Sequence, residues 1–105
     1  MRSVTVVIPV LDDADQLRAC LASLAAQTVP PTEVIVVDNG SSDDSAEVAR
    51  AAGAVVLHEP VRGIASAASR GYDAASGEVI ARVDSDSVLP HDLSLIHISE
   101  PTRPY

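Results

Sequence analysis

Apolar residues along this chain fall into two alternating patterns. Short runs rich in Val, Ile and Leu cover residues 4–10, 33–38, 54–59 and 78–84, and such runs are typical of strands buried on both faces of a sheet. Between the runs, apolar residues recur at helical spacing, which predicts helices over residues 13–27, 41–53 and 63–76. Asp13, with Gln16 three residues later, fits a capping box at the start of the first helix.

This alternation predicts an α/β fold of one domain. Strand–helix–strand units connect by right-handed crossovers, so the sheet is expected to be mainly parallel and doubly wound, with helices on both faces. Ligands of such sheets bind beyond the carboxyl ends of the strands. The four expected ends carry the sequences LDDAD, VDNGSSDD, HEPVRG and VDSDS, and three of them contain clustered carboxylates. We therefore expect a ligand site at that edge of the sheet.

Composition narrows the ligands and partners that this edge can take. The 105 residues include 15 acidic and 7 basic side chains, a formal net charge of −8. This balance argues against a nucleic-acid partner, because nucleic-acid binding needs basic charge to neutralise phosphates. An anionic ligand would need helix N-termini or a metal cation. Cys20 is the only cysteine, so we expect no internal disulfide, and its place in the helical pattern predicts a small core residue.

The first residues, MRSVTVVIPVL, carry one basic residue and an apolar run that Pro9 interrupts. This run is too short for a membrane span and makes a poor signal peptide. We therefore expect it to be the first strand of a cytoplasmic domain. Membrane association through another part of a longer protein stays open.

The stretch VDNGSSDD has a structural and a functional interpretation. In the structural one, Asp38 ends the strand, Gly40 makes the turn, and Ser41 or Ser42 caps the next helix. In the functional one, Asp38 and Asn39 present acceptors and an amide to the edge of a nucleotide base. Both interpretations stay open at this point, because loops of this kind are common in α/β proteins.

The stretch VDSDS indicates a metal site. Side chains at positions i and i+2 of an extended segment share a face, about 6.6 Å apart along the strand. Asp84 and Asp86 are therefore expected to point into one cavity, and Ser85 away from it. Mg²⁺ and Mn²⁺ are typically held by one or two carboxylates, with water and substrate phosphate completing the shell. The alternative is that Asp86 or Ser87 caps a turn, but two like charges at a ligand-binding edge are costly without a cation.

From Val4 to Pro90 the sequence resembles the N-terminal half of a family 2 glycosyltransferase with the Rossmann-like GT-A fold. The elements that carry the resemblance are the IPV strand with its acidic end, QT before the second strand, VVDNGSSD, a helix followed by GE, and the Asp-x-Asp motif in VDSDS. The resemblance implies transfer of a sugar, of the hexosyl type, from a nucleotide-diphosphate donor to an acceptor hydroxyl. It also implies inversion and a Mg²⁺ or Mn²⁺ cofactor. The acceptor would be a glycan, a lipid carrier or a small molecule.

The resemblance assigns roles to particular residues. It implies nucleotide binding by residues at the expected strand ends and the loops that follow them: Pro9, Val10, Asp12, Asp38, Asn39, Arg62 and Asp84. It implies a metal site at Asp84 and Asp86, with Asp86 as the direct ligand. Asn39 stands where the family often has a second Asp that contacts the base. The catalytic base and the acceptor region are expected beyond this chain, so no catalytic residue is expected within it and the chain alone is expected to be inactive.

Some positions depart from the family pattern. Leu11 stands where many members have a Tyr, and Val61 and Ser69 stand where many have an Asn, which leaves the identity of the donor open. Beyond residue 93 the resemblance stops. Residues 1–93 are therefore expected to be part of a glycosyltransferase domain, and residues 94–105, SLIHISEPTRPY, to be foreign to it or disordered.

Two other functions would use a similar sheet. A sugar nucleotidyltransferase needs a Gly-rich loop with basic residues after the first strand, where this chain has LDDADQ. A non-catalytic α/β module with a phosphorylation-type pocket needs a downstream lysine, and the chain contains no lysine. We rank both below the glycosyltransferase interpretation. A zinc site is also disfavoured, because His91 and His97 lack partners at ligand spacing.

Overall fold

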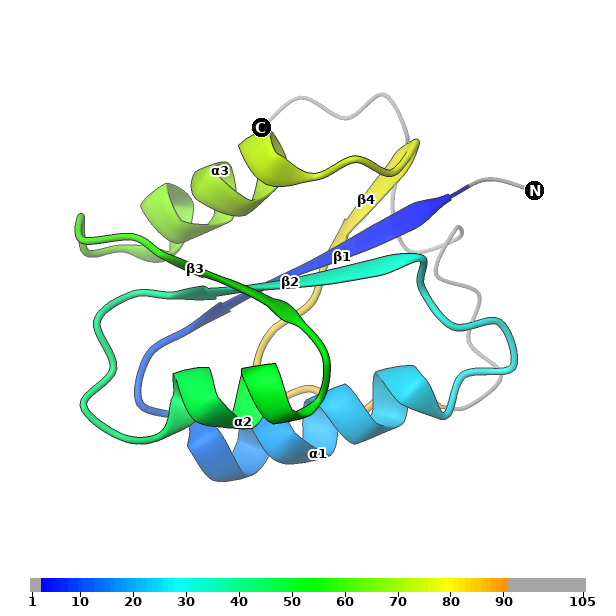
Figure 1. Ribbon diagram of the computed structural model, residues 1–105, viewed down its shortest axis with the longest axis horizontal. Coiled ribbons are helices and arrows are strands. Elements are labelled where there is room, and N and C mark those ends of the chain that lie inside the picture. The colour runs from blue at the N-terminus through cyan, green and yellow to red at the C-terminus, as the bar shows by residue number, and fades with distance from the viewer. Residues whose placement is uncertain (1–2, 91–105) are drawn as a thin grey trace.

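The structure is a computed structural model that describes residues 3–90 (Figure 1). Strands and helices alternate along this range in the order that the hydrophobic pattern predicts. The elements are β1 (Val4–Val10), α1 (Ala14–Ala25), β2 (Glu33–Asp38), α2 (Ser45–Ala51), β3 (Val55–His58), α3 (Ile64–Ala74) and β4 (Val79–Arg82). None of the helices in this range has the length and apolar character needed to cross a bilayer. The expected boundary at residue 93, the tail 94–105, His91 and His97 lie outside the described residues.

The strands of the described range form one parallel sheet in the order β3-β2-β1-β4. β1 pairs with β2 so that Val10 lies opposite Asp38, and β2 pairs with β3 so that Asp38 lies opposite His58. On the other side of β1, Val7 lies opposite Arg82 of β4. The carboxyl ends of the strands therefore reach the same edge. This arrangement confirms the expected α/β fold with a parallel sheet.

Helices cover both faces of the sheet (Figure 1). On one face, α1 and α2 pack side by side, and the larger core cluster forms beneath them. Ile8 and Val36 of the sheet belong to this cluster together with Leu17 and Leu24 of α1 and Val48 of α2. Because adjacent strand residues point to opposite faces, an uninterrupted apolar run such as that of β1 supplies both cores at once.

The opposite face is covered by α3, whose inward positions are small. Ala67, Ala68 and Gly71 are its buried residues, and Val7 and Val37 of the sheet lie beneath them. A Cβ atom at Gly71 would lie 2.3 Å from Cγ1 of Val7, so the helix reaches this distance from the sheet only with a glycine there. Close packing thus accounts for the Ala- and Gly-rich inner side of α3.

Two local predictions are wrong. The capping box at α1 does not form: Asp13 is the N-cap residue, but its side chain makes no cap hydrogen bond. The N–H of Ala14 instead donates to the carboxylate of Asp43, 3.1 Å away in the loop before α2. The last strand also ends earlier than expected, at Arg82, so that Asp84 and Asp86 follow the strand instead of extending it. Pairing of β4 with β1 stops at this point, and the chain bends into a turn in which Ser87 N–H donates to the carbonyl of Asp84.

Candidate functional site

A cavity of about 300 Å³ opens at the carboxyl ends of the central strands. Its walls come from the end of β1, the residue after β2, the start of α3 and the turn after β4. The lining residues are Pro9, Val10, Leu11, Asn39, Gly63, Ile64 and Ser85. The cavity thus brings together three of the predicted nucleotide-binding residues, Pro9, Val10 and Asn39. The other four, which are Asp12, Asp38, Arg62 and Asp84, lie outside the lining.

A larger groove of about 830 Å³ lies elsewhere, between α1, α2 and the amino end of β2. Apolar side chains such as Leu21, Val34 and Val48 form much of its wall, and it includes none of the residues predicted to bind the nucleotide or the metal. Ligands of parallel sheets bind beyond the carboxyl ends of the strands. The candidate site is therefore the smaller cavity.

Asn39 holds the loop between β3 and α3 at the wall of the cavity. Its Nδ2 donates to the carbonyls of Glu59 and Val61, at 2.8 and 3.0 Å, and its Oδ1 accepts from the N–H of Gly63 at 2.9 Å. The side chain is buried. Both amide protons are therefore used within the protein, so that a direct contact of Asn39 with a base would be confined to Oδ1. The structure gives Asn39 a loop-positioning role that its place in the sequence did not reveal.

Asp38 ends β2 and stabilises the turn that follows. Its Oδ1 accepts from the N–H of Ser41 at 3.0 Å, and its Oδ2 lies 3.6 Å from Nδ1 of the exposed His58 at the end of β3. Gly40 has a φ of +98°, a conformation that glycine adopts without steric cost. These contacts agree with the structural interpretation of Asp38 and Gly40. The expected cap from Ser41 or Ser42 is wrong, because α2 begins at Ser45.

Asp12 links the loop after β1 to the loop after β2. Its Oδ1 accepts from the N–H of Ser42 at 2.6 Å and from the N–H of Asp43 at 3.2 Å, while its own N–H donates to Oγ of Ser41 at 2.9 Å. Its φ is +50°, which a non-glycine residue rarely adopts, and the hydrogen bonds on both sides hold it there. The Asp12 carboxylate therefore faces the neighbouring loop and not the cavity.

The turn after β4 places its side chains in the opposite sense to the prediction. Ser85 is half-buried and lines the cavity, whereas Asp84 and Asp86 are exposed. Oγ of Ser85 donates to Oδ2 of Asp13 at 2.8 Å, and Oδ1 of Asp84 lies 3.3 Å from Nη2 of Arg82. The alternation of the two aspartates with Ser85 is confirmed, but the expectation that Ser85 points away from the cavity is wrong. The chain bends after Arg82, and the Asp13 carboxylate draws Ser85 inward.

The carboxylates of this turn affect the one cysteine. Cys20 is fully buried on α1, as predicted, and its Sγ lies 3.6 Å from the carbonyl oxygen of Asp84. Burial, together with the negative charges of Asp86, Asp13 and Asp84, raises the pKa of the Cys20 thiol to about 11. The thiol is therefore protonated at neutral pH and serves as a core residue. Asp13, Asp84 and Asp86 thus all lie close enough to act on the Cys20 side chain.

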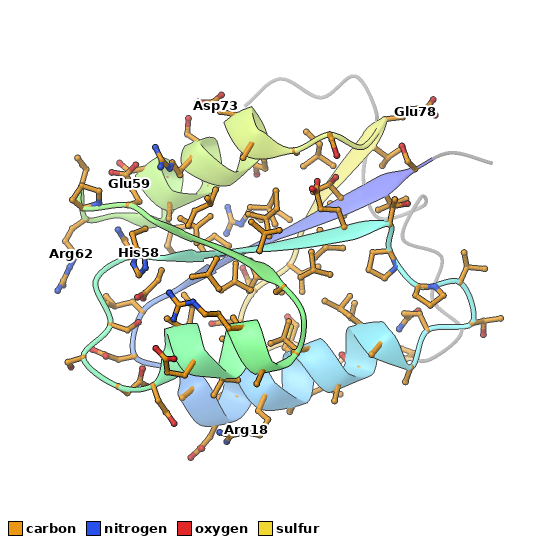
Figure 2. The ribbon with its side chains drawn as sticks, in the orientation of Figure 1. Arg18, His58, Glu59, Arg62, Asp73 and Glu78 are labelled. Atoms are coloured by element: carbon orange, nitrogen blue, oxygen red, sulfur yellow. The ribbon has the colours of Figure 1, made fainter. Side chains whose placement is uncertain are left out.

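Arg62 supplies positive charge beside the strand ends. A Cβ atom at Gly40 would lie 3.7 Å from Nε of Arg62, so the guanidinium lies over the turn after β2. Figure 2 shows Arg62 and His58 projecting from the same edge of the molecule. Arg62 is exposed, so its side chain can reorient toward an anionic ligand.

Comparison with known proteins decides the family. The sequence pattern of "Glycosyl transferase family 2" matches residues 5–99. The chain belongs to this family. Among curated relatives, it is 34% identical over 87 residues to the uncharacterized glycosyltransferase YibD of Escherichia coli, covering 78% of this chain and 25% of that protein. It is 34% identical over 91 residues to glycosyltransferase AglE of Haloferax volcanii, covering 79% of this chain and 30% of that protein. The chain thus spans about a quarter to a third of the length of these relatives.

Solved structures agree with this assignment. Glucosyl-3-phosphoglycerate synthase from Mycobacterium tuberculosis in complex with UDP is 33% identical, with a TM-score of 0.73 over 86% of this chain and 36% of that chain. The same enzyme with Mn²⁺, UDP and phosphoglyceric acid also gives a TM-score of 0.73 at 33% identity, over 86% of this chain and 35% of that chain. The likeness confirms the Rossmann-like GT-A fold.

Sequence reasoning did not assign four residues of the cavity to the site, namely Leu11, Gly63, Ile64 and Ser85. Gly63 is the N-cap of α3 and Ile64 is its first residue. Gly63 ends the stretch HEPVRG, which carried a usable signal because it follows a strand end. Ser85 was predicted to point away from the site, because side chains alternate along an extended strand. Only the bend after Arg82 and the contact with Asp13 reverse that expectation.

Proposed function

We propose that this chain supplies the donor-binding part of an enzyme that transfers a hexosyl group, with inversion, from a nucleotide-diphosphate donor to an acceptor hydroxyl. The observation that carries the proposal is the strand-end cavity with the exposed Asp84 and Asp86 on either side of its lining residue Ser85. Solved complexes of glucosyl-3-phosphoglycerate synthase with UDP and either Mn²⁺ or Mg²⁺ support it. The transfer reaction of the whole protein belongs to this proposal, because the chain spans only part of its relatives.

Apolar residues at the cavity suit the nucleoside. Leu11 and Ile64 line the cavity and are 40% and 61% exposed, although both are large aliphatic side chains. Covering them with the flat face of a base would remove apolar surface from water, which favours binding. Pro9 and Val10 complete this part of the wall. Leu11 would take the place of the Tyr that many family members have.

The start of α3 suits the diphosphate. Gly63 is the N-cap residue, no side chain caps the helix, and its first turn contains no acidic residue. The other two described helices carry Asp15 and Glu47 in their first turns. The positive end of the α3 dipole and its N–H groups would therefore attract an anion, with Arg62 as an additional cation one residue earlier.

Asp84 and Asp86 would hold the Mg²⁺ or Mn²⁺ ion. Within the described residues no cluster of three or more His, Cys, Asp or Glu side chains could hold a metal. Two exposed carboxylates with water and phosphate oxygens would meet the preference of these hard cations for oxygen ligands and a partly hydrated shell. A bound cation would neutralise the negative charge that develops on the diphosphate leaving group.

We propose that the chain alone does not transfer sugar, because the family resemblance puts the catalytic base and the acceptor region outside it. A base is needed to deprotonate the acceptor hydroxyl. Multiple-turnover transfer to a panel of glycan, lipid-linked and small-molecule acceptors measures this directly. Transfer by the purified 105-residue chain would contradict this part of the proposal.

Donor binding can be tested by isothermal titration calorimetry of UDP and GDP, with and without Mn²⁺. The wild type should bind a nucleoside diphosphate weakly alone and more tightly with the metal, because the chain has a net charge of −8 and the ligand is anionic. Asp86→Ala should remove the metal-dependent part, and Asp84→Ala should weaken it less. Asp73→Ala is a matched control that removes one exposed acidic side chain on α3, away from the turn after β4 (Figure 2).

Circular dichroism of each variant establishes that the chain is folded before the titrations are compared. Nucleotide affinity that does not respond to metal in the folded wild type would contradict the donor-site proposal. Metal-dependent affinity that survives Asp86→Ala would move the cation site away from the turn after β4.

A further inference from the structure

The segment that follows β4 runs along α1 and is attached to it at both ends (Figure 1). At its start, Oγ of Ser85 donates to Oδ2 of Asp13 at 2.8 Å, a contact between residues 72 positions apart in the sequence. Sγ of Cys20 donates to the carbonyl of Asp84 at 3.6 Å, a distance suited to a weak sulfur hydrogen bond. The turn that carries the paired aspartates is therefore tied to the N-cap residue and to the middle of α1.

The end of the segment is held by residues at the end of α1. The N–H of Leu89 donates to Oγ of Ser23 at 3.1 Å, and Nε2 of Gln27 donates to the carbonyl of Pro90 at 2.7 Å. Gln27 is only 4% exposed, and within the described residues its Oε1 is buried without a hydrogen-bond partner. Residues 89 and 90 therefore stay attached to α1 through bonds that do not involve Asp13.

Asp13 can bind Ser85 because another residue caps the helix. An Asp at the N-cap position ordinarily accepts from N–H groups of the first helical turn. In this chain the Asp43 carboxylate accepts from the N–H of Ala14, and the Asp13 carboxylate makes no cap bond. Removal of the Asp13 carboxylate therefore leaves the start of α1 capped.

The two aspartates beside Ser85 have little support of their own. The Asp84 side chain is 65% exposed, and its ion pair with the half-exposed Arg82 belongs to a class that contributes little to stability. Within the described residues, Asp86 has no hydrogen-bond or ion-pair partner. Ser85 lies between them, and its bond to Asp13 joins the turn to the start of α1 through a side chain, in addition to the bonds that Ser87 N–H and Cys20 Sγ donate to the carbonyl of Asp84.

We propose that Asp13 is a positioning residue for the metal site at Asp84 and Asp86, and that it acts through Ser85. This inference rests on the proposed function, to which the metal site belongs. Loss of a partner that orients metal-binding groups typically lowers metal affinity by about 10- to 100-fold. We expect loss of the Asp13–Ser85 bond to weaken Mn²⁺ binding in the presence of UDP by about tenfold or more.

The negative charge of Asp13 has to be separated from its hydrogen bond. Ser85→Ala breaks the bond and keeps the charge, whereas Asp13→Asn removes the charge and keeps an oxygen that can accept from Ser85 Oγ. Positioning through the bond predicts weaker Mn²⁺ binding for Ser85→Ala and a milder effect for Asp13→Asn than for Asp13→Ala. An effect of charge alone predicts no change for Ser85→Ala.

The experiment titrates Mn²⁺ into the 105-residue chain with UDP present and follows free Mn²⁺ by its electron paramagnetic resonance signal. Asp13→Ala, Ser85→Ala and the double variant form a cycle, and the double variant should bind Mn²⁺ no more weakly than either single one. Asp15→Ala is the matched control, since Asp15 is an exposed acid on α1 whose one side-chain partner among residues 3–90 is Arg18. Melting temperature and metal-free UDP affinity are measured for every variant. If Asp13 positions the turn, the Asp13→Ala and Ser85→Ala variants lose metal-supported affinity while their melting temperatures stay near that of the wild type.

The outcomes separate this inference from the function on which it rests. Two results would overturn the inference and leave the proposed function standing, provided that Asp86→Ala still abolishes metal-supported binding. One is that Ser85→Ala binds Mn²⁺ like the wild type, and the other is that the effects of the two single variants add in the double variant. A weakening of Mn²⁺ binding that only accompanies a fall in melting temperature would also overturn it. A folded wild type whose UDP affinity does not respond to Mn²⁺ would overturn the proposed function and the inference together.

Discussion

Asp12 and Asp43 bind the loops after β1 and β2 to each other in both directions. The Asp12 carboxylate accepts from the N–H of Asp43 at 3.2 Å, and the Asp43 carboxylate accepts from the N–H of Ala14 at 3.1 Å. Asp43 also accepts from the N–H of Ser45 at the start of α2. One carboxylate therefore serves the N-termini of two helices, and the two loops form one unit at the edge of the site.

Asp43→Asn should destabilise the fold at neutral pH and have less effect in acid. Hydrogen bonds from the Ser45 hydroxyl, and then from the N–H groups of Ala14 and Ser45, hold the pKa of Asp43 below its ordinary value of 3.8. The stabilisation is therefore fully present above pH 3.8 and is lost as the pH falls through the lower folded-state pKa. Urea midpoints of wild type and variant, compared across the acid range, measure this. Asp44→Asn is the control, because Asp44 is next to Asp43 in the sequence and its side chain makes no cap hydrogen bond. Equal losses of stability in both variants would contradict the prediction.

Asn39→Asp should destabilise the chain at neutral pH. The variant would place carboxylate oxygen where Nδ2 now donates to the carbonyls of Glu59 and Val61. Leaving buried groups without their partners costs about 1–3 kcal/mol, and more for a charged group. Urea unfolding measures the loss, and hydrogen exchange of residues 59–63 shows whether the loop is released. A variant as stable as the wild type, with unchanged exchange in this loop, would disprove the assigned role of Asn39.

Gly71→Ala should lower stability by overpacking α3 against the sheet. The added methyl group would lie 2.3 Å from Cγ1 of Val7, and such overpacking typically costs about 1–3 kcal/mol. The exposed Ser69 on the same helix provides a control, since Ser69→Ala adds no atom toward the sheet. Combining Gly71→Ala with Val7→Ala should recover part of the loss, because the second change removes the clashing atom. Thermal unfolding of the wild type, Gly71→Ala, Ser69→Ala and the double variant checks this. The absence of any recovery in the double variant would place the strain elsewhere.

Cys20 should make the chain less stable in alkali. The thiol has an ordinary pKa of 9.0 and a folded-state pKa of about 11, because it is buried near three carboxylates. Its protonated form therefore contributes stability that is complete below pH 9.0 and is lost as the pH rises through about 11. The stability difference between wild type and Cys20→Ala, from urea unfolding, should shrink over this range. A difference that stays constant with pH would mean that the thiol titrates alike in the folded and unfolded chain.

The sequence alone determined the order of strands and helices and the class of fold. Runs such as Val4–Val10 are apolar on both faces, and only a sheet covered on both sides buries them. Parallel strands bring their carboxyl ends to one edge, so the clustered carboxylates after β1, β2 and β4 also indicated where the site lies. These features depend on patterns of neighbouring residues, which the sequence displays directly, and on general rules for how strands and helices are connected.

Only the tertiary structure decided what each of those polar side chains does. Asp43 caps a helix 29 positions away, Asn39 binds a loop 20 to 24 positions away, and Asp13 turns Ser85 inward across 72 positions. A short polar side chain at a strand end can bind its own loop, a neighbouring loop or a ligand with similar energy. The choice among these partners depends on which of them the packing of the sheet and helices brings within about 3 Å, and no local pattern of residues contains that distance.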